Sequence, residues 1–195
     1  MNRREALTRM VAITGAMAIG AEFFLTGCQH PEAKKRTLAL TPTELALLDE
    51  VGETIIPATN SPGAKAAGVG PFMAMIARDC YDDASYASFR GGLAKIEESS
   101  QKHHGKPFVA VSPSDRTALL NEFDREQRAY MKEKKRADPP HFFKLMKELT
   151  LLGFFSSEVG CTKAMRYVES PGSFDGNVIY KTGDRAWYNP SRRIN

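Results

Sequence analysis

Apolar residues recur at helical spacing through most of the chain after residue 40. In residues 42–56, Leu48, Val51 and Ile55 lie three or four positions apart, which is typical of an amphipathic helix. Similar spacing predicts further helices in residues 72–81, 86–104, from 113 onward, 140–155 and 157–167. Alternation typical of a β-strand is limited to residues 178–180. The pattern therefore predicts an all-α fold, a single-domain bundle of about five or six helices.

The densest apolar run lies in residues 142–155. The polar residues that interrupt it are Lys144, Lys147, Glu148 and Thr150. A surface helix would have a wider polar side, so we expect a central helix that is covered on most of its circumference. Pro139 and Pro140 are expected to open it, since proline is tolerated in a first turn. The alternative is a helix that also contacts a second protein.

Two stretches lack helical spacing. Residues 57–71 contain three prolines and three glycines, which predicts a long loop, and no phosphate-binding glycine pattern is found there. The tail, residues 177–195, contains the only tryptophan, Trp187, together with Tyr180 and Tyr188. We expect this irregular aromatic tail to pack against another surface.

The overall composition is that of one soluble domain. The chain has 195 residues, of which 42% are hydrophobic and 26% are charged. Its formal net charge of +4 is too mild to argue for nucleic-acid binding, which normally shows a concentrated basic face. We therefore expect no nucleic-acid partner.

The first residues have the character of an export signal. Arg3 and Arg4 precede a modestly apolar stretch in residues 11–25, which is too short and too weakly apolar for a membrane span. The paired arginines resemble a twin-arginine signal, a route that carries folded proteins. We expect residues 1–27 to be a twin-arginine-type lipoprotein signal peptide; the alternative is an uncleaved anchor helix.

The end of this signal suggests lipidation. Residues 25–28 resemble a bacterial lipobox, in which Cys28 becomes the lipidated first residue. The polar residues 28–40 would then form a tether between lipid and domain. The expected location is periplasmic and membrane-anchored, and Gln29 after the cysteine favours the outer membrane without deciding between the two membranes.

The histidine, cysteine and serine residues of the sequence show no spacing typical of a metal site or a catalytic site. The four histidines, His30, His103, His104 and His141, lack the spacing of metal ligands, and no CxxC or CxxCH pattern is present. We expect no metal, no cofactor and no catalytic residue in this chain. A hydrolase that uses Ser157, Glu158 and a distant histidine is the enzyme alternative, although Ser157 is more simply a helix cap.

The two cysteines after Cys28 have two interpretations. In an oxidising periplasm Cys80 and Cys161 can form a disulfide. Two buried free thiols are the preferred interpretation, because free cysteine is commonly a small buried apolar residue. Pairing of Cys161 across an interface is a third alternative.

Two blocks of sequence resemble the gluconate 2-dehydrogenase subunit 3 family. The first is Ile-Ile-Pro-Ala-Thr in residues 55–59 with Pro-Gly-Ala-Lys-Ala-Ala-Gly-Val in residues 62–69. The second is Gly-Phe-Phe-Ser-Ser-Glu-Val-Gly in residues 153–160, followed by Tyr167 and a Pro-Gly pair at 171–172. The resemblance covers about residues 41–176, which would form the family-like helical domain before the tail.

The resemblance implies a non-catalytic small subunit of a membrane-associated sugar or sugar-acid dehydrogenase. FAD would be held by the large subunit and haem c by a separate cytochrome c subunit, and the small subunit would stabilise and help export the large one. The residues expected at the partner interface are Pro62, Gly63, Phe154, Phe155, Ser157, Glu158, Gly160 and Trp187. A free-standing periplasmic lipoprotein with a structural or ligand-binding role is the alternative function.

Overall fold

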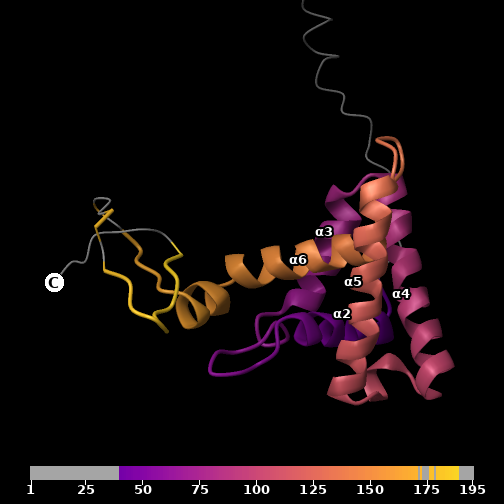
Figure 1. The fold of residues 1–195 in the computed structure, drawn as a ribbon, viewed down its shortest axis with the longest axis horizontal. Helices are drawn as coiled ribbons and strands as arrows, with labels where there is room; N and C mark the ends of the chain where they lie inside the picture. Colours follow the sequence, from indigo (N-terminus) through magenta and orange to yellow (C-terminus); the bar gives the residue numbers. More distant parts are fainter. Residues whose placement is uncertain (1–39, 171, 173–175, 178, 189–195) are drawn as a thin grey trace, which may run out of the picture. The chain divides into compact units, whose positions relative to one another are not determined.

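Five α-helices and two short helical turns form the described part of the chain in a computed structural model (Figure 1). The structure describes residues 40–170, 172, 176–177 and 179–188, which belong to one compact unit of residues 39–195. The elements are α2 (Pro42–Ile55), α3 (Val69–Cys80), α4 (Asp83–His104), η1 (Phe108–Ala110), α5 (Pro113–Glu133), α6 (Phe142–Ser156) and η2 (Gly160–Ala164). These residues contain no strand, and the all-α prediction is confirmed.

Side-chain caps set where the helices begin. Thr41 and Glu44 form a capping box at α2, in which Thr41 Oγ1 accepts from the Glu44 N–H at 3.2 Å and the Glu44 carboxylate accepts from the Thr41 N–H at 2.8 Å. Helices α3 and α4 begin three residues earlier than the apolar spacing predicted. For α4 the reason is the cap at Asp82, whose carboxylate accepts from the Ser85 N–H at 2.7 Å.

The core forms where α6 packs against the other four α-helices. Figure 1 shows the first part of α6 among α2, α3, α4 and α5 and its last part extending past them. Phe142, the first residue of α6, is buried against Gly92 of α4, where a Cβ would overlap the phenylalanine ring. The buried first half of α6 is therefore the central helix that the sequence predicts.

The start of α6 differs from the prediction. Pro139 and Pro140 precede the helix, and His141 is its N-cap, with Nδ1 accepting from the Phe143 N–H at 3.2 Å. The two proline carbonyls instead accept hydrogen bonds from Tyr130 Oη at 2.9 Å and from Ser88 Oγ at 2.8 Å. These contacts fix the connection from α5 to α6 in place.

The predicted last helix, residues 157–167, is shorter than expected. Only η2, a π-helical turn, is formed within it, and the chain is extended at Met165. Beyond it an isolated bridge joins Arg166 to Trp187. The suggested strand at 178–180 includes Val178, which lies outside the described residues. Among the described helices, none is long and apolar enough to cross a membrane.

Candidate partner-binding surface

One side of α6 changes from charged to apolar along its length. Lys144, Glu148, Leu151 and Phe155 follow at steps of three and four residues and so share that side. Lys144 and Glu148 form an ion pair. Further along, Leu151, Leu152 and Phe155 are 41%, 55% and 41% exposed. We refer to these three residues as the apolar end of α6.

The opposite side of the same turns is held by the core. Phe154 is buried, and Gly153 lies against Phe72 of α3, whose Cδ1 would be 2.6 Å from a Cβ at that position. Thr150 is buried and donates to the Met146 carbonyl oxygen at 2.8 Å, so its hydroxyl is satisfied within the helix. The glycine allows α3 to pack closely here. These contacts leave Leu151, Leu152 and Phe155 on the side facing away from the bundle.

A tight turn ends α6 directly after the apolar end. Ser157 Oγ donates to the Phe154 carbonyl oxygen at 2.7 Å and accepts from the Gly160 N–H at 2.9 Å, as expected of a cap. A Cβ at Gly160 would overlap the Phe154 carbonyl oxygen, so the turn requires glycine. Cys161 is buried, and its thiol donates to the Phe155 carbonyl oxygen at 3.3 Å. These contacts therefore hold the last turn of α6 and the chain that follows it in a fixed conformation.

The described part of the tail pairs with the segment after η2. The Arg166 N–H donates to the Ala186 carbonyl oxygen at 2.8 Å, and the Arg166 guanidinium lies over the Trp187 ring at 5.2 Å. The rings of Tyr167 and Tyr188 are in tilted contact, with centroids 5.8 Å apart and an interplanar angle of 49°. Trp187 is thus half-buried by this chain's own arginine, an arrangement in which an arginine–aromatic contact is favourable.

Exposed large apolar side chains are unevenly distributed over the described residues. Met75, Val109 and Tyr130 are scattered over the part before α6. The other seven such residues lie between Leu151 and Tyr188 in the sequence, and three of them, Leu151, Leu152 and Phe155, lie together on the last turns of α6. Single exposed apolar residues are ordinary on a monomer, whereas a gathering of them is typical of a binding surface.

The loop of the first sequence block is pinned to α2. The Glu53 carboxylate accepts from the Ala58 N–H at 2.9 Å and from the Lys65 N–H at 2.9 Å. Gly63 is buried beneath it, and a Cβ at Gly63 would overlap this carboxylate. Pro62 beside it is half-buried. Gly63 is therefore needed for packing within the chain, because it leaves room for the Glu53 carboxylate.

The residues that the sequence placed at the partner interface differ in their exposure to solvent. Phe155 and Glu158 are exposed. Those that are buried are Gly63, Phe154 and Gly160, and those that are half-buried are Pro62, Ser157 and Trp187. Leu151 and Leu152 were missed as surface residues, because spacing alone does not say which side of a wholly apolar helix faces outward. The predicted export residues Arg3, Arg4 and Cys28 lie outside the described residues.

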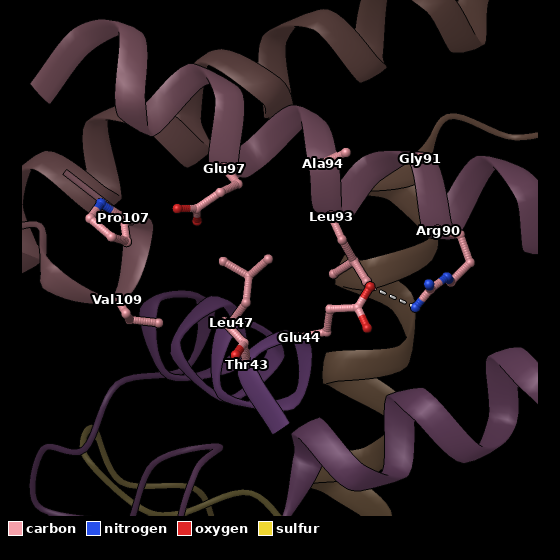
Figure 2. A pocket seen from close by; sticks show the side chains of 10 residues that line it. All are labelled: Thr43, Glu44, Leu47, Arg90, Gly91, Leu93, Ala94, Glu97, Pro107 and Val109. Carbon is pink, nitrogen blue, oxygen red and sulfur yellow. Dashed lines mark ion pairs between the residues drawn. The ribbon is translucent and has the colours of Figure 1, made fainter. Parts of the chain in front are cut away.

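A separate pocket lies between α2, α4 and η1 (Figure 2). It has a volume of about 500 Å³ and is lined mainly by apolar groups, including Leu47, Leu93 and Val109. Figure 2 shows an ion pair of Glu44 with Arg90 at one end and Glu97 at the other, with Leu47 and Leu93 between them. The size is within the range of about 300–1,000 Å³ found for ligand pockets.

The charges in this pocket are unequally satisfied. Arg90 Nη1 lies 2.8 Å from Glu44 Oε1. Burial acts to raise the pKa of Glu44, but the hydrogen bond from the Thr41 backbone and the positive charge of the nearby Arg90 outweigh it and lower the pKa. Glu97 accepts from the Phe108 N–H at 3.2 Å and forms no ion pair with a described residue. The pocket was not predicted, because it forms where segments distant in the sequence meet.

The hydrolase alternative finds no support in the described residues. His141 and Ser157 flank the two ends of α6, which has 15 residues and so a length of about 22 Å. His103 and His104 lie at the end of α4, away from the end of α6 in Figure 1. The described residues also contain no group of three His, Cys, Asp or Glu side chains placed to hold a metal ion.

Both described cysteines are free thiols. Cys161 is buried, as preferred from the sequence, whereas Cys80 at the end of α3 is exposed. No bond joins the two in this structure, so the disulfide left open by the sequence is not formed here. The expectation of two buried thiols is wrong for Cys80, because the last turn of α3 lies at the surface.

A comparison with protein families gives a match over most of the described residues. The family described as Gluconate 2-dehydrogenase subunit 3 matches residues 42–172, about two thirds of the chain. The match runs from the start of α2 to beyond η2 and includes both sequence blocks, while Trp187 and the tail lie outside it. Searches of curated proteins and of solved structures found no match.

Proposed function

The chain belongs to the gluconate 2-dehydrogenase subunit 3 family, and from this premise we propose that it is a non-catalytic small subunit. In this proposal it binds, stabilises and helps export the FAD-containing large subunit of a periplasmic sugar or sugar-acid dehydrogenase. A cytochrome c subunit with haem c would accept the electrons. The FAD and the haem belong to the partners, and this chain supplies binding surface.

One observation carries the proposal. The apolar end of α6 is exposed within the family-matched region, on a helix whose other side is anchored in the core. Apolar side chains on such a rigid support lose little conformational freedom on binding and gain the free energy of desolvation. The turn at Ser157 and Gly160 fixes the end of this surface. A protein-binding role explains why apolar residues face outward there.

The proposal also assigns the export steps. Arg3 and Arg4 would direct the folded chain through the twin-arginine route, and Cys28 would carry the lipid that anchors it in the membrane. A large subunit without a signal of its own would then cross the membrane only when bound. The small subunit would thereby couple assembly to export.

Co-expression tests this function. A candidate FAD-containing large subunit would be produced with the wild-type chain, with Arg3→Lys plus Arg4→Lys, and without it. The expected result is periplasmic, membrane-attached flavoprotein only with the wild-type chain. Equal export and dehydrogenase activity in all three cases would contradict the proposal and favour a free-standing lipoprotein.

A further inference from the structure

Gly91 in α4 has no explanation within the described chain. Its neighbour Gly92 is required, because the Phe142 ring occupies the space of a Cβ, whereas a Cβ at Gly91 would meet nothing within 4 Å. Glycine in a helix interior is unfavourable, so Gly91 weakens α4 with no packing gain. Gly91 lines the pocket between α2, α4 and η1, where its missing side chain leaves room for another molecule to approach the helix backbone.

The polar groups at the two ends of the pocket can form further hydrogen bonds or ion pairs. Arg90 Nη1 is buried and, despite its closeness to Glu44, is not aligned for a hydrogen bond with any described residue. At the other end the Glu97 carboxylate points toward Pro107 (Figure 2) and pairs with no cation among the described residues. The Arg90 guanidinium can donate a further hydrogen bond, and the Glu97 carboxylate can accept one or pair with a cation.

We infer that this pocket is a second contact site for the large subunit, where it binds an extended segment with one large apolar side chain beside a lysine or arginine. The apolar side chain would lie between Leu47 and Leu93, the cation would pair with Glu97, and a backbone carbonyl would accept from Arg90 Nη1. The pocket lining has two carboxylates, Glu44 and Glu97, and one guanidinium, Arg90. Its negative balance of charge favours binding of a basic segment. This inference rests on the proposed function and adds a site on α4, distinct from the apolar end of α6.

Filling the pocket tests the inference. Gly91→Leu places a side chain in the open space, and Gln101→Leu places the same side chain at an exposed position of α4 that does not line the pocket. Binding of the purified large subunit would be measured by calorimetry, with melting temperature as the folding control. We expect at least a tenfold loss of affinity for Gly91→Leu, no more than a twofold change for Gln101→Leu, and no fall in melting temperature for Gly91→Leu.

A second pair of variants tests the charge. Glu97→Gln removes the pocket carboxylate, and Glu98→Gln removes an exposed carboxylate next to it that does not line the pocket. We expect Glu97→Gln to weaken binding about fivefold and to reduce its dependence on salt concentration. Glu98→Gln should do neither. Wild-type affinity and salt dependence in Glu97→Gln would contradict the assigned role of the carboxylate.

The outcomes separate this inference from the proposed function. If variants at the apolar end of α6 abolish binding while Gly91→Leu binds as wild type, the pocket inference is overturned and the proposed function stands. If the wild-type chain does not bind the large subunit, both fail. If Gly91→Leu alters only self-association of the chain, the pocket belongs to a second copy and the inference is also overturned.

Discussion

The two halves of α6 bury one common side but differ on the other. In the first half the outer side has Lys144 paired with Glu148, and Lys147 reaches Asp124 of α5 at 2.6 Å. In the second half the outer side is the apolar end, with Leu152 more than half exposed. One helix therefore serves as core element along its whole length and as candidate binding surface only at its end. Apolar density along a sequence does not distinguish these two uses.

Substitution in the buried start of α6 should lower the free energy of unfolding more than substitution elsewhere in this helix. Phe142 packs on Gly92 and makes an edge-to-face contact with Phe123 at 5.2 Å between centroids. Phe142→Ala is expected to lower the free energy of unfolding by about 3–5 kcal/mol, because it removes a buried ring and leaves a cavity. Urea unfolding followed by circular dichroism measures this. A loss below about 1 kcal/mol would mean that the first half of α6 is not core.

The turn after the apolar end should come next in size. Gly160→Ala introduces a Cβ that overlaps the Phe154 carbonyl oxygen, so we expect a loss of about 1–3 kcal/mol from overpacking. Gly91→Ala is the matched control, since its Cβ meets open space and should stabilise α4 by about 0.5–1 kcal/mol. Thermal unfolding of both variants gives the comparison. Equal effects of the two substitutions would contradict the geometry of the turn.

The N-cap of α6 should make stability depend on pH. Burial lowers the pKa of His141 below its usual 6.5, while Glu126 acts in the opposite direction. His141 therefore binds a proton more readily in the unfolded chain than in the folded one. The contribution of neutral His141 to the free energy of unfolding is fully present above pH 6.5 and is lost as pH falls toward the folded-state pKa. Unfolding measured from pH 8 to pH 5 should show this fall in wild type and a smaller one in His141→Gln. Identical profiles would exclude His141 as the source.

The apolar end should be the least sensitive region in stability. Leu152→Ala removes a side chain that is 55% exposed, so the free energy of unfolding should change by no more than about 0.5 kcal/mol. The same urea titration used for Phe142→Ala detects the difference between the two halves. A loss of several kcal/mol at Leu152 would place it in the core of the isolated chain.

Helical spacing predicted most of the fold. The starts expected at residues 42 and 113 are those of α2 and α5, where Thr41 and Ser112 form local side-chain caps. The start of α6 was placed too early, since hydrogen bonds from Tyr130 and Ser88 to the proline carbonyls are contacts between distant residues. The end of the 157–167 segment was missed for a similar reason, because Arg166 pairs with the tail.

The candidate surface was predicted less well than the fold. The second sequence block located the correct turn, but it did not separate Phe155, which faces out, from Phe154, which faces in. That distinction depends on where α3 and η2 pack. The pocket on α4 depends on the spatial meeting of α2, α4 and η1, which are distant in the sequence.

The central claim is that the exposed apolar end of α6 binds the large subunit. The most direct measurement is the dissociation constant of the complex for Leu152→Asp plus Phe155→Asp, with Met75→Asp as the control because Met75 is similarly exposed on α3. We predict that affinity falls by about 30-fold or more in the double variant, as for hot-spot residues, and changes less than threefold in the control. Wild-type affinity in a folded double variant would contradict the account.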